Sequence, residues 1–260
     1  MEKPSAVALV DRPLGENWIA MSNALTRAGH GLTLAEKRLI FCAISRLDSR
    51  SNLVPGMVLS SRVTAADYAE VAGCESSAAY EALQTAAKNL YERSITFFVQ
   101  AKNRRGKPIE SSIKRMRWVG SATYMKNEGW VDLAWWPEVL PHLTGLRDEF
   151  TAYQLRQTHA LRSVYSWKLL ELLTKFEPTG WAQYTIEDFA TAMEATPKQR
   201  EDFAKIRTKI IEPAIRELQE KDGWLIQCKP LKAGRRVAAL RFDFVRNETP
   251  QSIPLPKPPA

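Results

Sequence analysis

Reactive and metal-binding side chains are scarce in this sequence of 260 residues. It has three cysteines and three histidines, and no C-x-x-C motif. Isolated histidines lack the spacing of a metal site or of the histidine pair in a DNA-nicking enzyme. An odd number of widely spaced cysteines does not build a disulfide framework. We therefore expect no catalytic residues, no metal and no cofactor, and buried thiols in a reducing cytoplasm at Cys42, Cys74 and Cys228.

Long apolar runs and nucleotide-binding motifs are missing too. No stretch of 18 or more apolar residues occurs, and no basic segment followed by an apolar one opens the chain. We expect neither a membrane span nor a secretion signal. The phosphate loop G-x-x-x-x-G-K-[ST] is also absent, so the chain lacks this ATPase signature. These absences favour a non-enzymatic protein of the cytoplasm.

Positive charge is in excess over an otherwise ordinary composition. The chain is 45% hydrophobic, which suits one large or two small globular domains. The formal net charge is +8 and the isoelectric point is about 9.4. Such a balance favours a polyanionic partner, with nucleic acid the first candidate and a membrane surface the second.

The chain carries an internal repeat. Two short helices open with the same T-x-x-D cap, in VTAADYAEVAG at 63–73 and YTIEDFATAME at 184–194. Each follows a long apolar helix, at 32–47 and 164–176, and precedes a turn and a second helix. A pair of extended segments then completes each unit, the first from 94 to 124 and the second from 223 to 245. This order is that of a winged helix, so we predict an α+β fold of two tandem, pseudo-duplicated winged-helix domains.

The domain limits follow from the repeat. We place an N-terminal winged-helix domain at 23–145 and a C-terminal one at 146–246. The ends, 1–22 and 247–260, contain proline and lack periodicity, so we expect a disordered arm and a disordered Pro-rich tail.

The second helix of the C-terminal unit, 196–218, has the pattern of a DNA-reading helix. Thr196 is a good N-cap and Pro197 suits the first helical position. One face is apolar, and we expect a bend where Pro213 frees the carbonyl of Lys209. Its first turns carry the candidate DNA contacts Lys198, Gln199, Arg200, Lys205, Arg207 and Lys209. We expect base contacts from Arg200 and Arg207, although Arg207 could instead pair with an acid at the domain edge.

Cationic hairpin tips and the first domain supply further candidates. The tips, predicted to lie where a DNA backbone passes, contain Lys232, Arg235 and Arg236 in the second domain and Lys102, Arg104, Arg105 and Lys107 in the first. The reading helix of the first domain offers Ser76, Ser77 and Tyr80, with its cations late and balanced by acids. The C-terminal domain is therefore the predicted principal reader.

The chain resembles the theta-type plasmid replication initiators that bind iterons. The likeness runs from residue 22 to 244 and rests on four segments in order, SNALTRAGHGLTLAEKRLIFCAISRLDS, VTAADYAEVAG, EFTAYQLRQTHALRSVYSWKLLELL and FAKIRTKIIEPAIRELQEKDGWLIQ. Each motif is loose, but the ordered set is specific. One departure is that Ala204 and Ile206 interrupt the cations of the reading helix, so individual base contacts are not carried over.

The resemblance implies a function as well as a fold. Members of this family use the C-terminal domain to read the main part of an iteron, while the N-terminal domain contacts the backbone and forms the dimer. It implies that monomers bind direct repeats at the origin and that dimers bind an inverted-repeat operator and repress their own gene. The implied partners are double-stranded DNA, a host initiator and a helicase or its loader, in the bacterial cytoplasm on plasmid DNA. We expect the dimer surface in the hairpin at 94–124.

Two other function classes stay open from the sequence. A dimeric winged-helix transcription repressor without a replication role would need the same fold and the same positive charge, because fold does not determine function. It would protect only a palindrome, whereas an initiator would protect each tandem repeat. A metal-dependent nuclease or relaxase would instead cleave supercoiled plasmid when metal is added.

Overall fold

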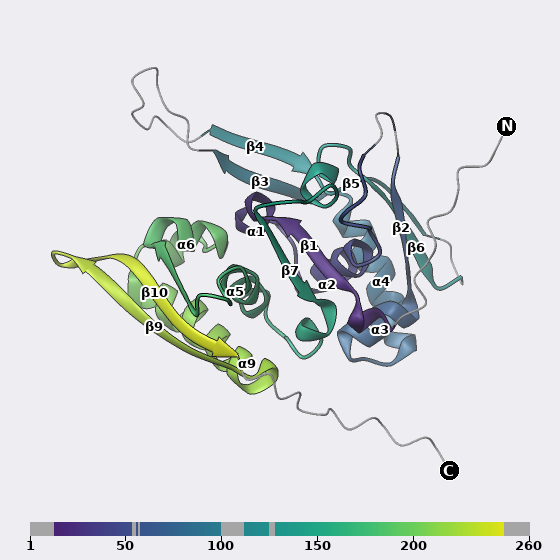
Figure 1. The fold of residues 1–260 in the computed structure, drawn as a ribbon. Coiled ribbons are helices and arrows are strands. Elements are labelled where there is room, and N and C mark those ends of the chain that lie inside the picture. Colours follow the sequence, from purple (N-terminus) through teal and green to yellow (C-terminus); the bar gives the residue numbers. More distant parts are fainter. Residues whose placement is uncertain (1–12, 54–55, 57, 100–111, 125–127, 247–260) are drawn as a thin grey trace, which may run out of the picture.

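Two winged-helix domains lie in tandem along the chain, as predicted (Figure 1). The computed structural model describes residues 13–53, 56, 58–99, 112–124 and 128–246. Each domain has a three-stranded antiparallel sheet with the same strand order, β2-β6-β5 in the first and β8-β10-β9 in the second. The repeat read from the sequence is therefore a repeat of topology.

The first domain is built from a helical layer on one sheet. Thr33 caps its first long helix through a capping box with Glu36, and Thr64 caps the next through Asp67. Its elements are α2 (Leu34–Ile44), β2 (Ser60–Thr64), α3 (Ala65–Ala72), α4 (Ser76–Leu90), β5 (Val119–Tyr124) and β6 (Trp130–Trp135).

A separate hairpin is inserted between α4 and β5. Strands β3 (Ser94–Val99) and β4 (Ser112–Arg117) pair only with each other among the described strands. We predicted a pair of extended segments over 94–124, but three strands lie there, because the chain turns at Trp118, where the indole is buried and its Nε1 donates to the His30 carbonyl at 3.0 Å. By strand order the wing of this domain is β5–β6, so assigning the wing to the hairpin at 94–124 was wrong.

The second domain repeats the plan with a more broken helical segment. It begins with α5 (Val164–Thr174), β8 (Trp181–Thr185) and α6 (Ile186–Ala192). The predicted second helix is divided into α7 (Pro197–Arg200), α8 (Phe203–Ile206), a π-helical turn (Arg207–Ile211) and α9 (Glu212–Asp222). The wing follows as β9 (Trp224–Ala233) and β10 (Arg236–Arg246).

The N-terminal region differs from the expected disordered arm. Residues Leu14–Glu16 form a 3₁₀ turn, and β1 (Trp18–Ser22) pairs antiparallel with β7 (Phe150–Gln154) before α1 (Asn23–Arg27). Ile19 and Met21 are fully buried, which supplies the apolar burial that a disordered arm lacks. The prediction is wrong for 14–22; residues 1–12 and the tail at 247–260 lie outside the described residues.

One continuous core joins the two halves, and Figure 1 shows α5 between them. Short 3₁₀ turns at Leu140–His142 and Leu155–Thr158 flank β7, which leads into α5.

Cys42 is buried and Cys228 is half-buried, but Cys74 is exposed at the turn before α4, so the prediction of three buried thiols was wrong there. No helix within the described ranges is long and apolar enough to cross a bilayer.

Candidate nucleic-acid interface

The reading segment of the second domain starts as the sequence predicted. The Thr196 hydroxyl oxygen accepts a hydrogen bond from the Gln199 amide, and Gln199 Oε1 accepts one from the Thr196 amide, while Pro197 occupies the first turn. The helix then stops, because Asp202 is extended at φ −144° and caps α8 through the Ala204 amide at 2.9 Å. The single helix predicted over 196–218 is therefore interrupted one turn after it begins.

A π-helical turn replaces the predicted bend. The Glu212 amide donates to the Arg207 carbonyl, a five-residue step, directly before Pro213. Pro213 has no N–H for the Lys209 carbonyl and its ring would press on that oxygen, so a wider turn relieves the clash. The turn also changes the helical phase, and both Ile210 and Ile211 are buried as a result.

Arg200 is exposed, but its guanidinium is bound to the protein's own backbone. Its Nε donates to the Ala195 carbonyl at 2.9 Å and its Nη2 to the Ala190 carbonyl at 3.1 Å. A third bond joins Nη1 to the Thr191 hydroxyl at 3.2 Å. These acceptors belong to the C-terminal end of α6 and the turn after it, where cations stabilise free carbonyls. Without DNA, Arg200 therefore caps this helix end, and its base contact stays a prediction.

Three other predicted DNA contacts are also engaged within the protein. Gln199 completes the cap and meets the Tyr165 hydroxyl, with Nε2 at 3.3 Å. Lys205 pairs with Glu201 at 2.7 Å. Arg207 lies 3.3 Å from Glu212, so the acidic partner that the sequence left open for it is present. Both ion pairs are exposed, and exposed pairs are weak enough for a phosphate or a base to replace the carboxylate.

The remaining predicted cations of the second domain are exposed. Lys198 and Lys209 have no ion-pair or hydrogen-bond partner among the described residues. The wing turn presents Lys232, Arg235 and Arg236 to solvent, and Figure 1 shows the β9–β10 hairpin projecting from the body. Lysine and arginine with free donors are suited to phosphate oxygens.

The first domain offers a different surface. Ser76 and Ser77 are exposed in the first turn of α4, and Tyr80 is half-buried with its hydroxyl 2.7 Å from Gln84 Nε2. The predicted tip cations Lys102, Arg104, Arg105 and Lys107 lie outside the described residues. They connect β3 to β4, which is not the wing of this domain.

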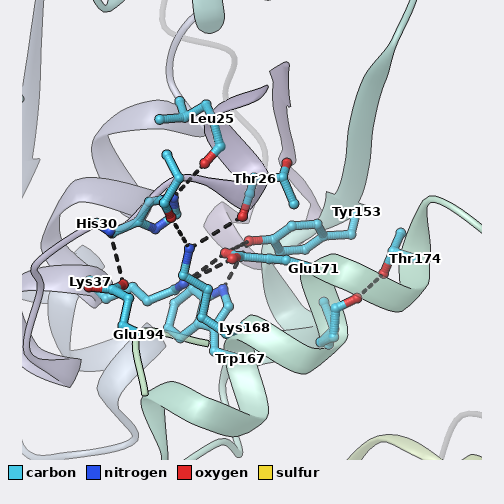
Figure 2. Close-up of polar contacts among 12 residues, drawn as sticks. Leu25, Thr26, His30, Lys37, Tyr153, Trp167, Lys168, Glu171, Thr174 and Glu194 are labelled. Carbon is cyan, nitrogen blue, oxygen red and sulfur yellow. Dashed lines mark hydrogen bonds and ion pairs between the residues drawn. The ribbon is translucent and has the colours of Figure 1, made fainter. Parts of the chain in front are cut away.

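Buried charges hold α5 against α2 and the segment after α1. Lys37 of α2 pairs with Glu171 of α5 at 2.9 Å, with both side chains fully buried, and Glu171 also accepts from the Tyr153 hydroxyl (Figure 2). Lys168 donates to the carbonyls of Thr26 and Ala28, at 3.3 and 2.8 Å. Burial and then Lys37 lower the pKa of Lys168 to about 8. The groups satisfy one another, as buried charges require.

Metal-binding geometry is not found at this interface. No group of three or more histidine, cysteine, aspartate or glutamate side chains could hold a metal within the described ranges. His30 is buried, and that burial lowers its pKa well below the usual value. The chemistry of the surface is that of positive charge and hydrogen-bond donors.

Family comparisons agree with the two-domain fold. The family described as "Initiator Replication protein, WH1" matches residues 18–174, and "Initiator Rep protein, WH2" matches residues 185–244. The chain belongs to the initiator replication protein family. The resemblance stated from the sequence motifs is thereby confirmed.

This initiator has relatives of known sequence and structure. It is 24% identical to the PI protein of Escherichia coli over 257 residues, which covers 87% of this chain and 82% of that protein. An uncharacterised 27.6 kDa protein of Escherichia coli is 22% identical over 214 residues, 78% of this chain and 85% of that protein. The solved structure of the Pi initiator protein in complex with iteron DNA has a TM-score of 0.71 at 20% identity, covering 90% of this chain and 99% of that one.

Sequence reasoning missed the contacts that join the two domains of this initiator. The Glu194 carboxylate accepts from the His30 and Gly31 amides, each at 2.9 Å. Arg162 donates to Glu217 through its amide at 2.7 Å and to the Ala72 carbonyl through Nη1 at 3.4 Å. The partners are 55 to 164 residues apart in the sequence, so no local sequence pattern predicts these contacts.

Proposed function

We propose that this chain is a plasmid replication initiator that binds iteron repeats at an origin, as a monomer, through both winged-helix domains. One observation carries the proposal: a family member with the same fold over 90% of this chain was solved on iteron DNA. The exposed cations at Lys198, Lys209 and the second wing lie on the elements that a winged helix places against DNA.

The surfaces of the two domains support a proposed division of labour. The second domain has cations on its reading segment and on its wing, so it is the proposed sequence reader. The first domain has small polar side chains at the start of α4, which suit supporting contacts to the backbone. Arg207 is the strongest remaining candidate for a base contact, because its carboxylate partner is exposed and replaceable.

Dimerisation is proposed on the inserted hairpin, within the range 94–124 expected from the family. Among the described strands β4 pairs only with β3, so its other edge is open. Phe98 and Ile113 face each other across the hairpin and are 46% and 59% exposed. An open edge with apolar side chains is suited to pairing with a second copy across a two-fold axis. The dimer would bind an inverted-repeat operator and repress the chain's own gene.

The proposed setting is the bacterial cytoplasm, on the plasmid that encodes the chain. A host initiator and a helicase or its loader are the proposed protein partners once the origin opens. The competing function, a repressor with no replication role, is an outcome of the test below.

Footprinting on two duplexes tests the proposal. On tandem repeats from the encoding replicon we expect one protected unit per monomer, with melting of adjacent A+T-rich DNA. On an inverted repeat we expect protection by a dimer, which Ile113→Lys should abolish while leaving the tandem footprint intact. Protection of the palindrome alone would favour the repressor. If six to ten phosphates are contacted, the log–log salt slope should be about −5 to −9, and a slope near −2 would contradict two-domain binding.

A further inference from the structure

The turn between α6 and α7 is hydrogen-bonded to the first domain through Glu194, and we call these two bonds the clasp. Glu194 Oε1 accepts the His30 amide at 2.9 Å and Oε2 accepts the Gly31 amide at 2.9 Å; Figure 2 shows this carboxylate beside His30. Among the described residues, these are the hydrogen bonds that tie the α6–α7 turn to the first domain. Both oxygens of one side chain are thus used on consecutive backbone amides.

The backbone of Glu194 is unusual. Its φ is +53°, in the left-handed region that residues with a side chain seldom adopt. Such a conformation persists where surrounding contacts hold it. The adjacent Ala195 amide donates to the Ala190 carbonyl at 2.8 Å, so the turn is fixed on the helix side as well. Glycine or asparagine would suit this backbone better, but neither side chain could reach both amides.

The clasp links two functional elements. On the second domain, Glu194 lies two residues before Thr196, the cap of the reading segment. On the first domain, the clasped loop is continuous with Gly29, which bridges to Thr96 of β3 through bonds of 2.9 and 2.7 Å. A short chain of hydrogen bonds therefore runs from the inserted hairpin to the start of the reading segment.

Two connected binding modules gain affinity only when both fit the duplex together. The gain depends on a relative orientation that matches the spacing of the two contacts on DNA. The buried pair Lys37–Glu171 joins α5 to the first domain, whereas the clasp holds the reading side of the second domain itself. Rotation of the reading segment against the first domain must break these two bonds.

We propose that Glu194 is a positioning residue that sets the orientation of the reading segment relative to the first domain, and thereby the spacing tolerated between the two DNA contacts. This inference rests on the proposed function, because it concerns how both domains engage one site. Glu194 itself need not touch DNA.

The test uses the full chain and a spacing series of duplexes. The wild-type footprint first defines the parts of the repeat protected by each domain. One or two base pairs are then inserted or deleted between those parts, and affinities are measured for wild type and Glu194→Gln. The glutamine amide nitrogen cannot accept a hydrogen bond, so one of the two backbone amides loses its partner. Glu187→Gln, on the exposed face of α6, is the control with the same charge change.

The expected result is a loss of spacing preference. Wild type and Glu187→Gln should bind altered spacings at least tenfold more weakly than the natural one. Glu194→Gln should bind the natural spacing about tenfold more weakly than wild type, yet lose less than about threefold further on altered spacings. Glu194→Gly, which suits the left-handed backbone but lacks the carboxylate, should give the same flattened profile even if the glutamine variant folds poorly.

Two results would overturn the inference. An unchanged spacing preference in both Glu194 variants, with only a lower thermal midpoint, would leave Glu194 a purely structural role. Absence of repeat-specific binding by wild type would refute the proposed function and the positioning role together. The wild-type measurement on the natural spacing distinguishes these two failures.

Discussion

The two domains share strand order and capping, yet differ in what they place on their surfaces. The reading segment of the second is broken by a cap at Asp202 and a π turn at Arg207–Ile211, and it exposes lysines. The first has an unbroken fifteen-residue helix, α4, with serine and alanine at its start, and an extra hairpin after it. This difference is the basis of the proposed division, in which the second domain reads DNA and the first supports binding and dimerisation.

The largest expected effect concerns the buried charges that hold α5 against α2. Glu171→Gln leaves Lys37 and Lys168 buried without their carboxylate, so we expect a loss of about 3–5 kcal/mol in the free energy of unfolding. Urea unfolding measures it. Glu201→Gln, which breaks the exposed pair with Lys205, should change the same quantity by less than about 0.5 kcal/mol. Equal losses of unfolding free energy in the two variants would show that the buried Lys37–Glu171 pair does not stabilise the packing of α5 on α2.

The pH dependence of the unfolding free energy tests the lowered pKa of buried Lys168. The pKa of Lys168 is about 8 in the fold, against an ordinary value near 10.5. Between these values the unfolded chain binds more protons, so the stability contributed by this group rises with pH from about 8 to about 10.5. We expect the unfolding free energy of wild type minus that of Lys168→Met to rise by at most about 1.4 kcal/mol per pH unit in this window. A flat difference would show that Lys168 titrates normally.

Removing cations from the second domain and hydroxyl groups from the first tests the proposed division of labour. Lys198→Ala combined with Lys209→Ala should lower the magnitude of the salt slope by about 2, because each lysine is expected to neutralise one phosphate. Filter binding or fluorescence anisotropy across a salt series measures the slope. The matched change in the first domain, Ser76→Ala with Ser77→Ala, should leave the slope unaltered. The reverse pattern would exchange the roles of the two domains.

The smallest expected effect concerns Arg200. Its bonds to α6 carbonyls predict that Arg200→Ala lowers the free energy of unfolding by about 1 kcal/mol. It should leave the preferred base at every position of the site unchanged. If the variant is as stable as wild type and its preference is relaxed at one base pair, the result would support the base contact by Arg200 that the sequence predicted.

Local chemistry explains which features were predictable. The T-x-x-D caps, Pro197 and the alternating apolar positions act over a few residues, so both winged helices and their order could be read directly. The break at Asp202 was missed because a good cap lay inside an otherwise continuous apolar stripe. The pairing of β1 with β7 was missed because its partners are more than a hundred residues apart.

The location of the candidate site stays a prediction, whereas the intramolecular partners of its side chains could not be read from the sequence. Charge indicated the second domain, yet Arg200, Gln199, Lys205 and Arg207 all have partners within the protein. Those partners depend on turns and phases that periodicity alone does not determine. The inserted hairpin was mistaken for a wing because strand order, not sequence order, identifies the wing.

Selection of bound sites from random DNA tests the central claim most directly. Full-length wild type, Arg207→Ala and Ser77→Ala would be compared. We predict that Arg207→Ala relaxes one base position, a loss of about 1–3 kcal/mol in discrimination, while Ser77→Ala returns the wild-type motif with lower affinity at most. An unchanged motif for Arg207→Ala, together with an altered one for Ser77→Ala, would contradict it.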